Sequence, residues 1–213
     1  MERSLSPARG THLRPAVFLD RDGVLNEESG YVHRIDEVTW IPGSLDAVRR
    51  LHEAGFVLIL VTNQAGVARG LYTEADVQAL HRWMDDAIQR AGGRIDAWYY
   101  NPTHPEGTVP RYAIKHPDRK PGTGMFERAL REHGIDPMRS FMVGDKTSDL
   151  IPARQLELVN ILVRTGHGPD HLELAPADVV VDDLAAAADW ILGLGDASSK
   201  AVIPDPDPGS RSA

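Results

Sequence analysis

Short apolar segments alternate with amphipathic helical segments along most of the chain, and this alternation constrains the fold more than any other feature. When helices separate successive strands, the strands run parallel, because each crossover returns the chain to the same edge of the sheet. The sequence therefore predicts an α/β fold with a doubly wound, mainly parallel sheet flanked by helices. The segments predicted as strands are residues 16–20, 56–63, 95–101, 140–145, 160–163 and 179–181.

Turn and capping residues mark the ends of the predicted helices. The first helix opens at the sequence PGS, with Ser44 as the expected N-cap. The second begins near Thr73, where Asp76 three residues later indicates a capping box. Two more helices are predicted at residues 122–134 and 184–195.

The length of 213 residues suits one domain with a well-buried core and is short for two. We expect this domain, a phosphatase domain on the argument below, at residues 15–195. Residues 1–14 have no periodicity, and residues 196–213 are rich in proline, aspartate and serine. A flexible N-terminal segment and a disordered C-terminal tail are therefore expected.

Charge and composition argue against several classes of function. The formal net charge of −8 disfavours nucleic-acid binding, which needs a basic surface. The chain has no cysteine, so neither disulfides nor thiolate metal sites form. No apolar run reaches membrane-spanning length, and the N-terminus lacks the apolar core of a secretory signal. We therefore expect a cytoplasmic protein with no nucleic-acid or membrane partner.

Polar residues with metal-binding and phosphate-binding chemistry follow three of the predicted strands. Asp20 and Asp22 follow the first strand, Thr62 and Asn63 end the second, and Asp145 follows the fourth. In doubly wound sheets, ligands bind beyond the carboxyl ends of the strands. The sequence therefore predicts that these side chains meet at one edge of the sheet.

The acidic residues of this set predict a magnesium site. Asp20 and Asp22 do not form an EF-hand loop, because that loop needs glycine at its sixth position and Gly23 stands at the fourth. With Asp145, they are placed to surround one hard divalent cation, and Mg²⁺ suits oxygen ligands. Asp149 is placed either to join this set or only to cap the following helix.

Together these groups predict phosphoryl transfer. One aspartate attacks phosphorus and forms an aspartyl phosphate, while the second, held protonated by its neighbour, protonates the leaving alcohol. A cation and Lys120 offset the repulsion between carboxylate and phosphate, about 4 kcal/mol per charge pair at about 4 Å. The segment 101–121 carries a net positive charge, with Arg119 placed to bind an anionic or polar part of the substrate.

The motifs DRDGVLN, GYVH, VTNQAGVARG, RKPGTGM and VGDK resemble the haloacid dehalogenase superfamily of phosphohydrolases. The resemblance spans residues 16 to about 165 and is nearest to the branch that contains heptose bisphosphate and histidinol-phosphate phosphatases. It implies a minimal cap and magnesium-dependent hydrolysis of the 7-phosphate of D-glycero-D-manno-heptose 1,7-bisphosphate through an aspartyl phosphate. Histidinol phosphate, or another small sugar phosphate, is the alternative substrate.

The resemblance also implies a role for each motif residue. Asp20 is the nucleophile and Asp22 the general acid and base, while Thr62 and Lys120 stabilise the phosphoryl group. The Asp20 carboxylate, the Asp22 backbone carbonyl and Asp145 hold Mg²⁺. The residues implied in substrate binding are Glu28, Ser29, Gly30, Tyr31, Asn63, Gln64, Ala65, Arg119 and Lys146.

One departure from the family concerns the loop after the third strand. Many relatives fold this loop around zinc with three cysteines and a histidine, whereas the matching positions here are Asn101, Thr103, His116 and Asp118. No structural zinc is expected, because a closed thiolate site cannot form. His104, His116 and Asp118 are an alternative set of ligands, but we expect flexible or structural histidines in a loop held by its prolines and local packing.

Two functions of other classes share parts of this pattern. A receiver-type signalling domain also uses an acidic pair, Mg²⁺, a threonine and a lysine, but its acceptor aspartate ends a later strand, where this chain has Thr62 and Asn63. A nucleotide-binding module finds no support, because neither G-x-G-x-x-G nor a P-loop pattern occurs. We expect a monomeric enzyme that acts on a small phosphorylated sugar.

Overall fold

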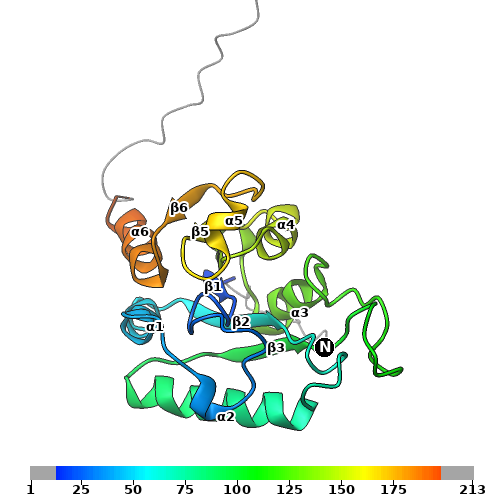
Figure 1. The fold of residues 1–213 in the computed structure, drawn as a ribbon. Helices are drawn as coiled ribbons and strands as arrows, with labels where there is room; N and C mark the ends of the chain where they lie inside the picture. The colour runs from blue at the N-terminus through cyan, green and yellow to red at the C-terminus, as the bar shows by residue number, and fades with distance from the viewer. Residues whose placement is uncertain (1–12, 198–213) are drawn as a thin grey trace, which may run out of the picture.

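The computed structural model describes residues 13–197, which form one six-stranded sheet with helices on both faces (Figure 1). The strand order is β3-β2-β1-β4-β5-β6, and all neighbouring strands are parallel. The predicted fold class is confirmed, and each strand lies within two residues of its predicted bounds. The strands are β1 (Ala16–Leu19), β2 (Val57–Asn63), β3 (Ala97–Asn101), β4 (Phe141–Gly144), β5 (Val159–Val163) and β6 (Val179–Val181).

The helices divide between the two faces of the sheet. Helices α1, α2 and α6 contribute to the buried cluster on one face, and α3 and α4 to the cluster on the other. The side chains of β1 alternate between them, as a doubly covered strand requires: Val17 faces the first cluster and Phe18 the second. The helices are α1 (Ser44–Glu53), α2 (Glu74–Arg90), α3 (Gly124–His133), α4 (Thr147–Gln155), α5 (Gly168–His171) and α6 (Leu184–Ala197), with single turns η1 (Ile35–Glu37) and η2 (Pro137–Arg139).

One predicted helix cap is confirmed and one is wrong. Thr73 caps α2, and its hydroxyl oxygen accepts from the Asp76 backbone N–H while the Asp76 carboxylate accepts from the Thr73 backbone N–H. At α1 the N-cap is Gly43, and Ser44 is already helical. The Ser44 hydroxyl is fully buried and donates to the carbonyl of Leu25 at 2.9 Å, so it anchors the preceding loop and does not cap its own helix.

The chain order reverses at the centre of the sheet. The chain runs outward from β1 through β2 to β3, and then returns to place β4 on the other side of β1. Such a switch point opens a crevice at the carboxyl ends of the two central strands, which is where Asp20 and Asp145 stand. The two longest connections, residues 20–43 and 102–123, border this edge, and within residues 13–197 neither carries an additional domain.

The ordered domain extends slightly beyond the predicted limits of residues 15 and 195. Arg14, expected in the flexible N-terminal segment, pairs with Ile135 in an isolated parallel bridge, and α6 continues to Ala197 inside the expected tail. The remainder of the two expected terminal segments, residues 1–12 and 198–213, lies outside the described residues. Across the described part of the chain, no helix has the length and apolar character needed to cross a bilayer.

Candidate active site

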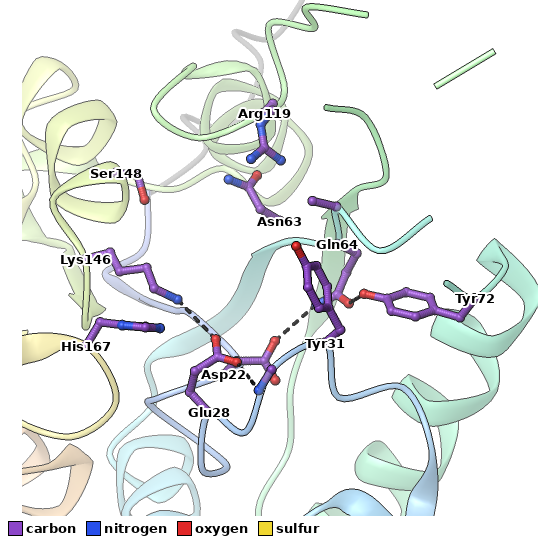
Figure 2. A pocket seen from close by; sticks show the side chains of 12 residues that line it. Asp22, Glu28, Tyr31, Asn63, Gln64, Tyr72, Arg119, Lys146, Ser148 and His167 are labelled. Atoms are coloured by element: carbon purple, nitrogen blue, oxygen red, sulfur yellow. Dashed lines mark hydrogen bonds and ion pairs between the residues drawn. The ribbon is translucent and has the colours of Figure 1, made fainter. Parts of the chain in front are cut away.

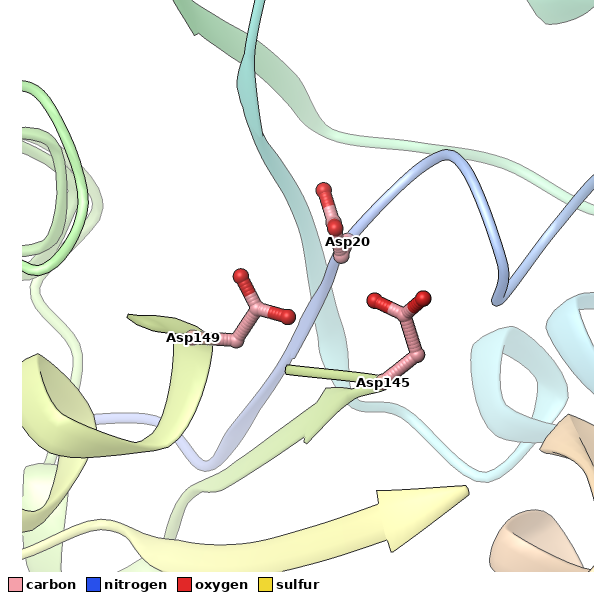
Figure 3. Close-up of side chains that lie close together, drawn as sticks. All are labelled: Asp20, Asp145 and Asp149. Carbon is pink, nitrogen blue, oxygen red and sulfur yellow. The ribbon is translucent and has the colours of Figure 1, made fainter. Parts of the chain in front are cut away.

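Three buried carboxylates from two strand ends and one helix meet at the switch point (Figure 3). Asp20 follows β1, Asp145 follows β4 and Asp149 lies in the first turn of α4. One oxygen from each lies within 4.8 Å of the others, and among residues 13–197 this is the one such group of three acidic or histidine side chains. Parallel pairing of β1 with β4 brings the first two together.

Two oxygens of this cluster lack the donors that buried carboxylates normally have. Asp20 Oδ1 and Asp145 Oδ1 are buried without a hydrogen-bond donor among the described residues. The nearest cation to Asp20 Oδ1 is Lys120, whose Nζ forms an ion pair with it at 3.0 Å. Because unsatisfied buried carboxylate oxygens are costly, the pair fits a hard divalent cation such as Mg²⁺.

Asp149 differs from Asp20 and Asp145 because each of its carboxylate oxygens has a partner. Its Oδ1 lies 2.7 Å from Lys120 Nζ, and its Oδ2 accepts from the backbone N–H of Lys146 at 3.0 Å. The two interpretations left open for Asp149 both hold in part, since it caps α4 and also lies in the acidic cluster. Its oxygens are used by these donors, so its principal contact in the site is with the lysine.

Lys120 is the fixed positive charge of the cluster. Its ammonium group is buried and also donates to the carbonyl of Val61 at 2.9 Å. The Asn63 amide accepts from the Lys120 backbone N–H and donates to its carbonyl, each at 3.0 Å, which ties this loop to the end of β2. Burial opposes the charged form, but Asp149 and Asp20 outweigh it and raise the pKa of Lys120.

Burial and mutual repulsion favour protonation of the acidic cluster. Desolvation, with a further contribution from Asp149, raises the pKa of Asp20 to about 6 although Lys120 opposes the shift. Desolvation and the charges of Asp149 and Asp20 raise the pKa of Asp145 to about 8. A cation in this position would favour the ionised carboxylates against both effects, so metal binding would displace protons.

Asp22 lies close in sequence and lines the same small cavity as Asp20, but its carboxylate has a different set of partners. Its carboxylate accepts from Arg21, from Asn26 Nδ2 at 3.0 Å and from Gln64 Nε2 at 3.3 Å. Burial alone would raise its pKa, but Arg21 and these hydrogen bonds hold the pKa of Asp22 below its usual value. The expectation that a neighbouring aspartate keeps Asp22 protonated is therefore wrong, because the side chains around it stabilise the ionised form.

Gly23 allows the turn after Asp22 to pack directly on Asp145. Its φ of +83° is in the left-handed region, and a Cβ at this position would collide with the Asp145 carboxylate. From the other side, the backbone N–H of His167 donates to Asp145 Oδ2 at 2.9 Å, and the Thr165 hydroxyl donates to the Gly23 carbonyl at 2.6 Å. The segment after β5 thus completes the site, a contribution that the sequence analysis missed.

A cavity of about 380 Å³ opens beside these groups (Figure 2). Arg119 lies on one wall, and Lys146 and His167 lie beside Glu28 and Asp22, with Lys146 Nζ 3.2 Å from Glu28 Oε2. A smaller cavity of about 60 Å³ connects it to the acidic cluster, because both are lined by Asp22, Glu28, Asn63, Lys146 and Ser148. The volume of the larger cavity suits a small polar metabolite.

Most of the residues expected to bind substrate line this larger cavity. Ser29 is exposed and is not part of the lining, because it lies at the outer side of its loop. Thr62 lines the smaller cavity and is buried, and Gln64 donates to its hydroxyl at 3.0 Å. The expected residues that line the larger cavity are Glu28, Gly30, Tyr31, Asn63, Gln64, Ala65, Arg119 and Lys146.

Three lining residues were not identified from the sequence. Tyr72 donates from its hydroxyl to Gln64 Oε1 at 2.8 Å and so fixes the amide that reaches Asp22. Ser148 and His167 also line the cavity. Ser148 stands inside the GDKTSD motif and His167 follows the fifth strand, so their positions at strand ends were a usable signal.

The four positions that match the zinc ligands of relatives belong to a hydrogen-bonded loop. Asn101 Oδ1 accepts from the backbone N–H and the hydroxyl of Thr103, and Asn101 Nδ2 lies 3.4 Å from His116 Nδ1. Asp118 pairs with Arg128 at 2.9 Å. Within residues 13–197, His104, His116 and Asp118 do not form a group spaced for one shared metal ion.

Comparisons with known proteins agree with this fold. A family model described as HAD-hydrolase-like matches residues 118–187. A D-glycero-D-manno-heptose-1,7-bisphosphate 7-phosphatase of Thermosynechococcus vestitus is 46% identical over 187 residues, which cover 84% of this chain and 95% of that protein. This chain belongs to the HAD-like phosphatase family. A second HAD-like relative, the D-glycero-beta-D-manno-heptose-1,7-bisphosphate 7-phosphatase of Yersinia pestis, is 43% identical and covers 84% of this chain and 89% of its own.

Two solved structures of HAD-like phosphatases have the same fold. The D,D-heptose 1,7-bisphosphate phosphatase from B. bronchiseptica, complexed with magnesium and phosphate, gives a TM-score of 0.77 at 36% identity. The corresponding enzyme from Burkholderia thailandensis gives a TM-score of 0.62 at 34% identity. Each match covers 84% of this chain and 99% of the other chain.

Proposed function

We propose that this phosphatase removes the 7-phosphate of D-glycero-D-manno-heptose 1,7-bisphosphate in a magnesium-dependent reaction through an aspartyl phosphate. The observation that carries the proposal is the pair of unsatisfied oxygens on Asp20 and Asp145 beside buried Lys120, next to a cavity lined by Arg119. The substrate is inferred from the curated relatives and solved structures named above.

The Asp20 and Asp145 carboxylates are the side chains that would hold Mg²⁺, with the Asp22 backbone carbonyl as the third protein ligand implied by the family. When bound, the cation supplies positive charge that offsets the repulsion between the nucleophile and the phosphate and polarises the phosphoryl oxygens. In this assignment Asp149 is a positioning residue, because its oxygens are occupied by Lys120 and the start of α4.

The protein side chains then divide the reaction between them. An Asp20 oxygen forms a bond to phosphorus as the bond from phosphorus to the leaving sugar oxygen breaks, and Asp22 gives that oxygen a proton. Lys120 and the Thr62 hydroxyl contact the transferring phosphoryl oxygens. Water then attacks phosphorus and transfers its proton to Asp22, which releases phosphate and restores Asp20. Because Asp22 is ionised in the free protein, the dianionic phosphoryl group must raise its pKa on binding.

Arg119, on the wall of the larger cavity, favours a substrate with a second phosphate. Arg119 lines the cavity, and within residues 13–197 neither Arg119 nor nearby Arg69 pairs with a carboxylate. Burial and the charge of Arg69 lower the pKa of Arg119, so the two guanidinium groups repel each other and an anion would relieve the repulsion. Histidinol phosphate carries an ammonium group at the corresponding end, which Arg119 would repel.

The test is phosphate release from α and β heptose bisphosphate and from histidinol phosphate, with saturating Mg²⁺ and with chelator. We expect release from heptose bisphosphate that is lost with chelator and in the Asp20→Asn variant. A higher kcat/KM for histidinol phosphate would overturn the substrate assignment but keep the mechanism. Absence of release from every ester, or an acyl phosphate trapped on a residue other than Asp20, would overturn the mechanism and reopen the receiver alternative.

Three further predictions belong to this proposal and stay predictions. They are that the protein is a monomer, that it acts in the cytoplasm, and that its loop at residues 101–121 needs no zinc. Size-exclusion chromatography with light scattering and metal analysis of chelator-washed protein test the first and the third directly. A stoichiometric zinc content would contradict the third.

A further inference from the structure

Arg21 stands between the two aspartates of the DRDG motif, and none of the roles above uses its side chain. The side chain is 1% exposed. Its Nε donates to Asp22 Oδ1 at 3.1 Å and its Nη2 donates to Asp22 Oδ2 at 2.9 Å, a bidentate contact that holds both oxygens of one carboxylate. Its Nη2 also donates to the carbonyl of Val32 at 2.6 Å, in the long loop that precedes α1.

His81 of α2 supplies the remaining contact of this guanidinium. Arg21 Nη1 lies 3.3 Å from His81 Nε2. Because arginine only donates, Nε2 must accept, and the imidazole is neutral with its proton on Nδ1. Burial, with the charge of Arg21, lowers the pKa of His81 to about 3, in agreement with a neutral ring. The ring packs on Trp98 of β3 with centroids 4.9 Å apart.

The result is a continuous contact from α2 to the catalytic pocket. His81 borders a separate cavity of about 260 Å³ at the α2–β3 edge and does not line the catalytic pocket. Its one polar contact among the described residues leads inward to Arg21, and Arg21 in turn grips Asp22. A bidentate guanidinium fixes the plane of the carboxylate as well as its position, so its own orientation decides where the Asp22 oxygens point.

We propose that Arg21 and His81 are positioning residues for proton transfer, with the neutral His81 ring orienting Arg21 and Arg21 holding Asp22 toward the leaving oxygen. The proposal rests on the proposed function, in which Asp22 protonates the sugar oxygen as its bond to phosphorus breaks. An ester whose leaving group needs no proton should not depend on this contact, whereas an alkyl ester should.

The test compares kcat/KM for heptose bisphosphate and for p-nitrophenyl phosphate at saturating Mg²⁺, in the full chain and its variants. This parameter covers binding and the first chemical step, in which the acid acts. His81→Phe keeps a ring of similar shape but removes the acceptor. We expect about a 10²-fold loss for the heptose ester, the scale of a misplaced catalytic group, and a much smaller loss for the aryl ester. His81→Gln retains an acceptor and should restore most of the heptose activity.

Two controls separate positioning from a general packing defect. Trp98→Phe perturbs the same packing without removing the contact between His81 and Arg21, so it should not change the ratio of the two kcat/KM values. Arg21→Lys keeps the charge and removes the bidentate geometry, so it should change the ratio as His81→Phe does, and it serves if His81→Phe fails to fold. Long-range ¹H–¹⁵N NMR should show the His81 proton on Nδ1.

The outcomes are distinguishable. An active wild-type enzyme whose His81→Phe and Arg21→Lys variants lose the same fraction of both activities would overturn the positioning role and leave the proposed function standing. Failure of His81→Gln to recover more activity than His81→Phe would also overturn it. A wild-type chain that hydrolyses neither ester would overturn the proposed function and this inference with it.

Discussion

Asp20 and Asp22 are separated by one residue, yet they lie in opposite environments. Asp20 is buried with an oxygen that has no hydrogen-bond donor, and desolvation raises its pKa to about 6. Asp22 accepts from Arg21, Asn26 and Gln64, and despite its burial the pKa of this carboxyl is lowered. The comparison shows that local environment, and not proximity in sequence, assigns different chemistry to two identical side chains.

The backbone explains why the two side chains separate. The Asp20 N–H donates to the carbonyl of Val143, which continues the β1–β4 pairing and places its side chain at the switch point. The chain then turns at Gly23, whose N–H donates to the Asn26 carbonyl at 2.7 Å. Asp22 therefore lies in a tight turn, where its carboxylate accepts from Gln64 and Arg21.

Replacement of Asp20, the carboxylate with an oxygen that lacks a hydrogen-bond donor, should have the largest effect on turnover. We expect Asp20→Asn to abolish turnover, because an amide does not attack phosphorus, and to preserve the fold, because one of several crowded charges is removed. Steady-state phosphate release and thermal unfolding would measure both effects. Measurable turnover in a folded Asp20→Asn variant would break the comparison, since Asp20 would then not be the nucleophile.

Replacement of Asp22, whose oxygens accept several hydrogen bonds, should have a smaller effect on turnover. We expect Asp22→Asn to lower kcat by about 10²- to 10⁴-fold, the usual contribution of general acid–base catalysis. The loss in kcat/KM should be larger for an alkyl phosphate than for p-nitrophenyl phosphate. Equal losses for the two esters would show that Asp22 does not donate to the leaving group.

Magnesium affinity should depend on pH through Asp20 and Asp145, and not through Asp22. Asp20 and Asp145 have raised pKa values of about 6 and about 8, so a metal must displace protons from them at lower pH. We expect the affinity for Mg²⁺ to fall about tenfold for each proton displaced per pH unit as the pH drops from 8 to 6. Calorimetric titrations in buffers of different ionisation enthalpy would measure the proton release, and a pH-independent affinity would contradict it.

The same groups set the sign of stability against pH for the metal-free protein. Their folded-state pKa values lie above the unfolded value of 3.8, so the folded state binds more protons than the unfolded chain between about pH 4 and pH 8. This contribution to stability is present at low pH and is lost as the pH rises through 8. Mg²⁺ should therefore raise the unfolding temperature more at pH 8 than at pH 6.

The smallest expected effect comes from His81, behind the satisfied aspartate. The folded-state pKa of His81 is about 3, below the ordinary value of 6.5. Below pH 6.5 the unfolded chain therefore binds one more proton than the folded protein, and the free energy of unfolding decreases as the pH is lowered. We expect a loss of about 2 kcal/mol of unfolding free energy between pH 7 and pH 5 that His81→Gln lacks. Denaturant unfolding at both pH values would measure it, with His52→Gln on α1 as a matched control. The same change in unfolding free energy between pH 7 and pH 5 in wild type, His81→Gln and His52→Gln would contradict a buried, neutral His81.

Much of the fold was predictable because its signals are local. Apolar runs and helical periodicity identified all six strands, and the Thr73 capping box depends on residues three apart. The strand-end positions of Asp20 and Asp145 also followed from this pattern, since parallel strands align their carboxyl ends. The Ser44 prediction failed because its hydroxyl bonds to Leu25, 19 positions earlier, a partner that local reasoning does not include.

The sequence by itself determined the parallel architecture and the residue types that gather at its carboxyl edge, because hydrophobic period and strand ends are written in neighbouring residues. Only the tertiary structure decided which carboxylates remain unsatisfied, that Asp149 engages Lys120, and that His81 supports Asp22 through Arg21. Solvation and hydrogen bonding depend on groups brought together across the sheet. His81 and Arg21 stand 60 residues apart, and the fold brings α2 into contact with the turn that follows β1.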